Sequence, residues 1–281
     1  MKIGTSSYSF QQYINGGKLT QKTAIAKAKE MGFDDIEFTD LCPEEGKTQL
    51  EYAAELKEEA EKCGIEISAY AIGANLAKAD EAEFRAEVER LKGQVDVAAA
   101  MGAKFMRHDV MYNYDDFRAF DMALPTIAKG AREVTGYAES KGVKTMVENH
   151  GFICQDPERV ERLICTVNHP NYGLLLDIGN FLCADVEPVL AVSKLVNLAF
   201  MVHAKDFRIY DYYIGRQIGF QTRAKNRLEG MSVGYGDIKM KQCLEIIKAS
   251  GFDGYMDIEY EGSGDCIEGI QRSLDYLRNN I

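Results

Sequence analysis

Four apolar segments of this sequence each end in a side chain that commonly binds metal ions. These side chains are Glu148, Asp177, His203 and Glu259. Short apolar runs of this kind are typical of buried β-strands. If the strands are parallel and end at one edge, three carboxylates and one imidazole converge on one point. Hard oxygen donors with one imidazole suit a divalent cation, so we predict one ion of Mn²⁺, Mg²⁺, Co²⁺ or Zn²⁺ there.

The chain around these residues alternates between strand-like and helix-like patterns. Strands are predicted at residues 2–7, 34–40, 65–71, 104–109, 145–148, 172–177, 197–203 and 255–259. Helices are predicted at residues 21–31, 49–62, 81–101, 125–141, 157–165, 188–195, 237–249 and 266–278. Glycine recurs between a helix and the next strand, where it accepts the left-handed conformation that ends a helix.

Eight such βα units in 281 residues favour one closed (β/α)8 barrel over an open doubly wound sheet. The absence of a GxGxxG motif after the first strand also argues against a dinucleotide-binding sheet. We therefore predict an α/β fold in which residues 1–281 form a single TIM-barrel domain.

The composition restricts the partners and the compartment. The chain has 33 Lys and Arg against 44 Asp and Glu, a formal net charge of −11, so nucleic acid is not expected as a partner. No apolar run approaches the roughly 18 residues of a spanning helix, and residues 1–5 favour a strand over a signal peptide, so no membrane partner is expected. The seven scattered cysteines favour reduced thiols in a cytoplasmic protein.

In a barrel of this kind the active site lies at the carboxyl ends of the strands. Further polar candidates at these ends are Glu37, Arg107, His108, His150, Asn180, Lys205 and Asp206. Arg107 and His108 could orient substrate hydroxyls, or form a structural ion pair with Glu37 beneath the site.

The connection between His203 and Asp237 is unusually long, and such connections are often lids or oligomer contacts. It is rich in basic residues, namely Arg208, Arg216, Arg223, Lys225 and Arg227. These side chains could bind an anionic substrate group or simply be solvated. We take Arg208 as a candidate substrate contact, and assembly into a homo-oligomer stays open.

Five motifs carry a resemblance to a known family. They are Val147-Glu148-Asn149-His150, Leu176-Asp177-Ile178-Gly179-Asn180, Val202-His203-Ala204-Lys205-Asp206, Gly234-Tyr235-Gly236-Asp237 and Ile258-Glu259-Tyr260-Glu261. The chain resembles the xylose isomerase-like TIM barrels, the sugar phosphate isomerase/epimerase superfamily, over essentially its whole length. The resemblance implies a small carbohydrate substrate and one divalent ion. By position the ion would be held by Glu148, Asp177, His203 and Glu259.

The resemblance also implies roles in the reaction. Glu148 and Glu259 would form the acid/base pair, and His150 would face the substrate. Lys205 and Asp206 match the family's HxKD pattern. Asn180 stands where ketose 3-epimerases are expected to have a histidine, which argues against a free ketohexose substrate.

The residue types fit this chemistry. Isomerising or epimerising a sugar requires removal of a weakly acidic proton α to a carbonyl, and a cation that binds the carbonyl oxygen and the neighbouring hydroxyl stabilises the enediolate. Carboxylates on different strands, such as Glu148 and Glu259, could take and return that proton from different sides.

Three other functions compete with an isomerase or epimerase. A lyase, acting on a ketosugar, an inosose or a 3-keto-glycoside, begins with the same proton abstraction, and His150 as an additional acid/base would favour it. An endonuclease of the same superfamily needs a histidine-rich site with several metals, and this chain has only four histidines. A binding barrel without catalysis would not need a pair of acid/base carboxylates.

Overall fold

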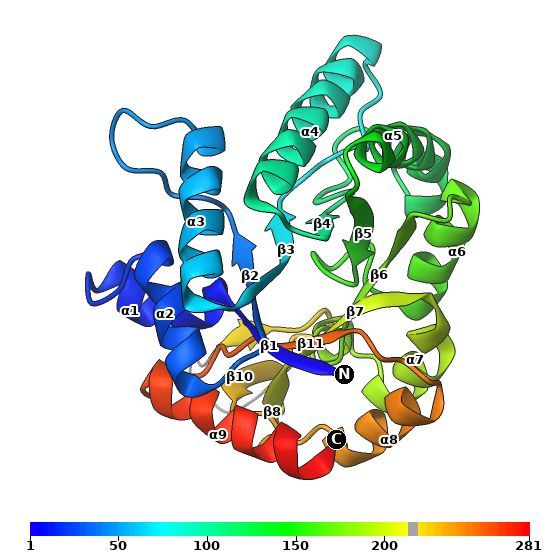
Figure 1. The fold of residues 1–281 in the computed structure, drawn as a ribbon. Coiled ribbons are helices and arrows are strands. Elements are labelled where there is room, and N and C mark those ends of the chain that lie inside the picture. Colours follow the sequence, from blue (N-terminus) through cyan, green and yellow to red (C-terminus); the bar gives the residue numbers. More distant parts are fainter. Residues whose placement is uncertain (213–218) are drawn as a thin grey trace.

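Eight parallel strands close into a barrel with helices arranged around it (Figure 1). This computed structural model describes residues 1–212 and 219–281. The barrel strands are β1 (Lys2–Ser6), β2 (Asp35–Thr39), β3 (Glu66–Ile72), β4 (Phe105–His108), β5 (Lys144–Glu148), β6 (Tyr172–Asp177), β7 (Ala199–Ala204) and β11 (Tyr255–Ile258). Their order around the barrel is β1-β11-β7-β6-β5-β4-β3-β2, which confirms the predicted (β/α)8 barrel.

The helices cover the outside of the barrel and follow the predicted pattern. The α-helices are α1 (Gln11–Asn15), α2 (Gln21–Met31), α3 (Gln49–Cys63), α4 (Glu81–Met101), α5 (Phe120–Ser140), α6 (Pro157–Val167), α7 (Pro188–Leu195), α8 (Met240–Ala249) and α9 (Cys266–Asn280). Short 3-10 turns are η1 (Ser7–Phe10), η2 (Asn180–Ala184) and η3 (Val196–Leu198).

Local sequence signals set the helix ends. The Thr48 side chain accepts the N–H of Glu51, and the Glu51 carboxylate accepts the N–H of Thr48 at 2.8 Å, which is a capping box at the start of α3. Gly64 then ends α3 with φ at 64°, a conformation that costs glycine little.

Two helices begin away from their predicted positions. α5 begins at Phe120, five residues before the predicted start, and Pro125 lies inside it, because the buried Phe120 side chain joins the core. α8 begins at Met240, three residues after the predicted start. Asp237 is held outside it, since its N–H donates to Phe207 O at 2.8 Å and its carboxylate accepts the N–H of Ile209 at 2.7 Å.

The long connection after β7 is not an irregular loop. It forms an antiparallel sheet in the order β8-β10-β9, built from β8 (Asp206–Tyr210), β9 (Phe220–Gln221) and β10 (Arg227–Met231). Arg223 is engaged by a bidentate ion pair, with Nη1 and Nη2 at 2.6 and 2.8 Å from the Asp156 carboxylate. Arg216 lies outside the described residues.

The barrel interior contains an unusual polar layer below the strand ends. Gly4 is paired in register with Asp35 on β2 and with Asp257 on β11, and both aspartates are fully buried. A Cβ atom at Gly4 would lie 2.3 Å from Asp35 Oδ1 and 2.5 Å from Asp257 Oδ1. The missing side chain of Gly4 is therefore what gives the two carboxyl groups their space.

Gly4→Ala is expected to lower the free energy of unfolding by about 1–3 kcal/mol, because the added methyl group overlaps buried carboxyl oxygens. The matched control is Gly93→Ala in the exposed part of α4, where a Cβ meets no atom within 4 Å. This control should gain about 0.5–1 kcal/mol. Urea unfolding followed by circular dichroism measures both, and equal midpoints for the two variants would contradict the packing of this layer.

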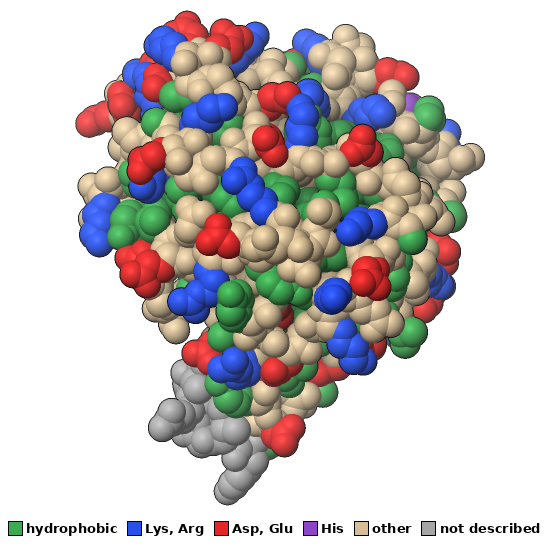
Figure 2. Space-filling view, turned by 60° about the horizontal axis from the view of Figure 1, so that its bottom comes forward, with side chains coloured by type: hydrophobic (Ala, Val, Ile, Leu, Met, Phe, Trp, Pro, Cys, Tyr) green, Lys and Arg blue, Asp and Glu red, His purple; other side chains and the backbone are tan. Residues whose placement is uncertain are grey.

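The surface drawn in Figure 2 mixes the two signs of charge. Lys and Arg side chains are interspersed with Asp and Glu side chains, and small apolar areas lie between them. Within the described ranges, no helix is long and apolar enough to cross a membrane.

Candidate metal centre

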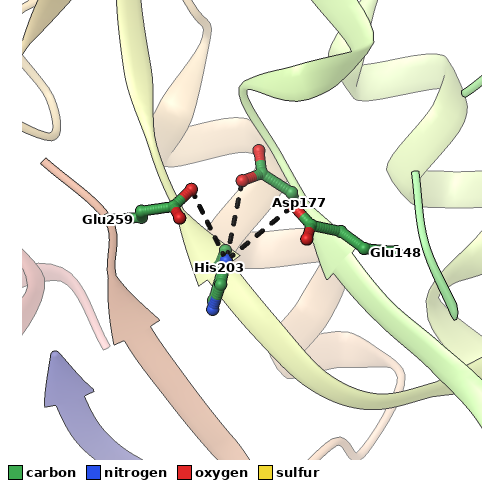
Figure 3. A group of neighbouring side chains, drawn as sticks. All are labelled: Glu148, Asp177, His203 and Glu259. Carbon is green, nitrogen blue, oxygen red and sulfur yellow. Dashed lines mark ion pairs between the residues drawn. The ribbon is translucent and has the colours of Figure 1, made fainter. Parts of the chain in front are cut away.

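The four predicted ligands meet at the carboxyl end of the barrel (Figure 3). One donor atom from each of Glu148, Asp177, His203 and Glu259 lies within 4.8 Å of the other three. His203 Nδ1 is 3.7 Å from Asp177 Oδ2, 3.7 Å from Glu259 Oε2 and 4.0 Å from Glu148 Oε1. The structure thus brings these four side chains around one point.

The strand order explains this convergence. Glu148 and Asp177 are the last residues of β5 and β6, His203 is the last but one of β7, and Glu259 directly follows β11. These four strands are consecutive in the barrel wall, and Asp177 pairs in register with His203. Residues far apart in the chain therefore become neighbours at one rim.

The state of the donor atoms fits a divalent cation. Asp177 Oδ2, His203 Nδ1 and Glu259 Oε2 are buried and have no hydrogen-bond partner. Buried polar atoms nearly always have one, so these three atoms, which lie around one point, are available to hold an ion. Lys205 forms ion pairs with Asp177 and Glu259, but without the geometry of a hydrogen bond to these two oxygens. Three carboxylates and one imidazole are a suitable set for Mn²⁺, Mg²⁺, Co²⁺ or Zn²⁺.

A buried carboxylate fixes the orientation of the imidazole. His203 Nε2 lies 2.5 Å from Glu37 Oε2, and both side chains are essentially inaccessible. This contact leaves His203 Nδ1 as the ring atom that faces the other three donors. Carboxylate support of a ligating histidine is common in metal sites, where it sets the tautomer and the ring position.

Amide side chains hold two of the carboxylate ligands in place. Asn149 Nδ2 donates to Asp177 O at 2.8 Å, and the N–H of Asp177 donates to Asn149 Oδ1 at 2.9 Å. Asn180 Nδ2 donates to Glu148 Oε1 at 2.7 Å, and Asn180 Oδ1 accepts from Lys205 Nζ at 3.1 Å. The ligand positions are therefore built into the barrel rim.

A second group of charged side chains adjoins Glu148. Arg107 Nη2 is 2.6 Å from Glu148 Oε2 and 3.2 Å from Asp109 Oδ1, and His150 Nδ1 is 2.9 Å from the same Asp109 oxygen. Burial alone would raise the pKa of Asp109, but Arg107 and His150 outweigh it and hold that pKa below its usual value. Asp109 is thus a carboxylate that orients both Arg107 and His150.

An open cavity of about 430 Å³ lies above the four donors. Its lining includes Glu148 and Glu259 from the donor group together with Arg107, Asp109, His150, Lys205 and Glu261. Tyr8, Gln11, Thr39, Asp40 and Tyr112 complete much of its polar wall. The size suits a small molecule.

A family model described as xylose isomerase-like TIM barrel matches residues 25–280. The chain belongs to the xylose isomerase-like TIM barrel family. This match confirms the resemblance seen in the sequence motifs, and it agrees with the closed barrel.

Two curated relatives of this family member give a range of similarity. The chain is 28% identical over 152 residues to the uncharacterized protein MJ1311 of Methanocaldococcus jannaschii, covering 52% of this chain but only 46% of that protein. It is 24% identical over 273 residues to an inosose dehydratase of Geobacillus thermodenitrificans, covering 88% of this chain and 84% of that protein.

Solved structures of similar barrels superpose along nearly the full chain. An L-ribulose 3-epimerase is 16% identical with a TM-score of 0.76, covering 99% of this chain and 94% of that one. The IolI protein with a bound zinc atom is 20% identical with a TM-score of 0.74, covering 99% and 97%. At these identities the similarity establishes the fold of the xylose isomerase-like barrels.

Four predicted substrate contacts of this family member are not part of the cavity lining. His108 is fully buried and faces outward from β4, with its ring 6.1 Å from that of Tyr172. Asp206 is buried, and its carboxylate accepts four backbone N–H groups. Glu37 supports His203 beneath the site and does not pair with Arg107. Exposed Arg208 donates from Nη2 to Tyr235 O at 3.2 Å.

The remaining candidates lie at the site. Arg107, His150 and Lys205 line the cavity, and Asn180 links Glu148 to Lys205 just beneath it. The sequence did not single out Asp109, Asp40 or Tyr112, which also line the cavity. Asp109 had a usable signal, since it ends the predicted strand 104–109 two residues after Arg107 and so points in the same direction.

Proposed function

We propose that this protein is a divalent-metal-dependent sugar isomerase or epimerase that removes and returns a proton α to a carbonyl. The observation that carries the proposal is the placement of Glu148 and Glu259. Both belong to the four-residue donor group and both line the same cavity. β6 and β7 lie between their strands in the barrel wall, which supports an approach of the two carboxylates to a substrate from different sides.

The residues of the site have different proposed roles. Glu148, Asp177, His203 and Glu259 would hold a divalent ion, which would supply Lewis-acid stabilisation of the negative charge that develops on the substrate. One of the two glutamates takes the proton from the carbon next to the carbonyl. The other returns a proton to the same carbon from the opposite face in an epimerisation, or a proton is returned to the neighbouring carbon in an isomerisation.

Each of the two glutamates has a cationic partner. Arg107 pairs with Glu148, and Lys205 pairs with Glu259. Burial alone would raise the pKa of Glu259, but Lys205 and His203 outweigh it and hold that pKa below its usual value. The carboxylate form is the one that can act as a base. The name of the L-ribulose 3-epimerase, a similar barrel, supports a sugar ketone as the substrate class.

Proton exchange in deuterium oxide tests the proposal. The manganese-loaded protein is incubated with candidate ketoses, and the deuterium content and mass of the recovered sugars are measured. An isomerase or epimerase places one deuterium on carbon and gives products of otherwise equal mass. Ketoses that are bound but recovered without deuterium would refute the proposed reaction.

A dehydratase is the second candidate, and the His150–Asp109 pair favours it. His150 lines the cavity and its Nδ1 is held 2.9 Å from Asp109 Oδ1, so Nε2 is the ring atom available to the substrate. In an elimination one base takes the α proton, the β C–O bond breaks, and an acid protonates the departing hydroxyl to give water. Relatives named as inosose dehydratases are in keeping with this alternative.

The variant His150→Asn separates the two reactions. For an isomerase or epimerase that uses both glutamates, we expect deuterium exchange to fall by no more than about tenfold, the loss of one substrate hydrogen bond. If His150 is the acid/base of an elimination, activity should fall by about 10²–10⁴-fold. Product mass, equal or lower by one water, is the independent readout.

A further inference from the structure

The charge of the cavity is strongly one-sided. Among the described residues that line it, five are carboxylates: Asp40, Asp109, Glu148, Glu259 and Glu261. Only two permanently cationic side chains, Arg107 and Lys205, accompany them. A divalent ion in the donor group would offset part of this charge.

Both cations are already engaged by the chain. Arg107 is bound to Glu148 and Asp109, and its Nη1 donates to Ile72 O at 3.2 Å. Lys205 Nζ pairs with Glu259 and lies 3.3 Å from Asp177 Oδ2 and 3.6 Å from Glu261 Oε1. An incoming phosphate or carboxylate would have to compete with these buried carboxylates for the same donors.

The backbone N–H groups after β7, which could bind a phosphate, already donate to a carboxylate of the chain. Phosphate in such barrels is commonly held by the loops after the seventh and eighth strands, here β7 and β11. After β7, backbone N–H groups converge on the Asp206 carboxylate, at 2.9 Å from Phe207, 2.9 Å from Gly234, 3.0 Å from Gly236 and 3.3 Å from Ile238. Converging N–H groups of this kind form an anion nest, and Asp206 is the anion in it.

The helix that follows β11 is capped in the same way. A helix N-terminus is the other common phosphate position. At α9, Asp265 Oδ1 accepts the N–H groups of Ile267 and Glu268 at 3.0 and 3.2 Å. Its second oxygen accepts from Tyr13 Oη at 2.7 Å. At both positions, the chain's own carboxylates take the donors that a phosphate would need.

We propose that the substrate is an uncharged polyhydroxy ketone and that this cavity rejects phosphorylated and carboxylated sugars. The inference rests on the proposed function for the keto group, and it adds the charge of the substrate. Other polar groups of the lining suit hydroxyls: Tyr8, Gln11 and Thr39 can donate and accept hydrogen bonds, and Asp40 and Glu261 can accept from hydroxyl groups. Under this proposal, the described basic residues after β7 are not expected to bind an anionic substrate group.

Matched ligand pairs test the charge preference. The manganese-loaded protein is titrated with D-fructose against D-fructose 6-phosphate, and with a myo-inositol-derived inosose against 3-dehydroshikimate, using thermal protection as the binding readout. In the pairs that bind, the neutral member should bind at least about tenfold more tightly, because like charges in a binding site repel. Equal or tighter binding of the anionic members, or no protection by either neutral ketone, would overturn the inference.

A charge-removing variant shows whether the cavity wall is responsible. Asp40→Asn removes one carboxylate at an exposed position of the wall, and asparagine tolerates its positive φ of 21°. It should lower the preference for the neutral ligand, measured as the ratio of its affinity to that of the anionic ligand, about threefold. The control Glu58→Gln, on the exposed face of α3, should leave this ratio unchanged. Equal ratios in both variants would contradict the assignment. Neutral ketones that bind selectively but show no deuterium exchange would refute the proposed reaction and leave the charge preference standing.

Discussion

Glu148→Gln is expected to lower deuterium exchange by at least about 10³-fold while the barrel stays folded. Glutamine keeps the shape of the side chain and can still accept from Asn180 Nδ2, which lies 2.7 Å from Glu148 Oε1. It cannot take up a proton as a base, and it is a poor ligand for a divalent ion. It also removes the carboxylate that lies 2.6 Å from Arg107 Nη2. Exchange measured by mass spectrometry, with circular dichroism as the fold readout, checks this result.

The matched control is Glu261→Gln. Glu261 lines the same cavity but lies outside the four-residue donor group. Burial, together with the nearby carboxylates, raises the pKa of Glu261 to about 7. Because Glu261 is not needed to hold the ion, its replacement should reduce exchange by no more than about tenfold. If Glu148→Gln retained as much activity as this control, Glu148 would have no part in the mechanism.

Lys205→Met is expected to destabilise the protein by about 3–5 kcal/mol when divalent ions are removed by a chelator. Lys205 is only 4% exposed and is surrounded by the carboxylates of Asp177, Glu259 and Glu261. Burial opposes its charge, but these carboxylates outweigh that effect and hold the pKa of Lys205 well above its usual value. Removing the ammonium leaves several buried negative charges close together. Urea unfolding in chelator measures the loss, and added Mn²⁺ should restore part of it.

Lys47→Met is the control for this experiment. Lys47 also forms two ion pairs with glutamates, Glu44 and Glu55, but these side chains are much more exposed. Exposed pairs contribute little, so the control should lose less than about 1 kcal/mol. Equal unfolding midpoints for the two variants would show that Lys205 does not neutralise a buried acidic cluster.

The barrel and the donor group could be predicted because both depend on local patterns. Apolar runs, helix caps and the glycines that follow several helices are encoded within a few residues, and parallel strands carry their terminal residues to one rim. Glu148, Asp177, His203 and Glu259 followed from residue type and strand position alone. Convergence then required only that their strands be neighbours, as the order β5-β6-β7-β11 makes them.

The side-chain directions at the strand ends were less well predicted. Successive residues of a strand point to opposite faces, so only one of Arg107 and His108 can face the barrel interior. The same alternation separates Lys205, which faces the cavity, from Asp206, which faces the loop behind it. Applied strictly, this rule would have removed His108 and Asp206 from the list of substrate contacts.

Other features depend on contacts between distant parts of the chain. In the sheet β8-β10-β9, the register of each strand depends on its partner strand. The N–H groups around Asp206 come together only when residues 234–238 fold back on it. The support of His203 by Glu37 joins β7 to β2 across the barrel interior. None of these three features has a pattern within one segment that would reveal it.

The stoichiometry of Mn²⁺ binding tests the central claim most directly, which is that four distant side chains hold one ion. Protein stripped with a chelator and dialysed against Mn²⁺ should contain one ion per chain by elemental analysis. Asp177→Asn, with nearly the same shape, should retain less than about a tenth of that amount at the same free Mn²⁺ concentration. Full loading of Asp177→Asn, or no bound ion in the unaltered protein, would contradict the account.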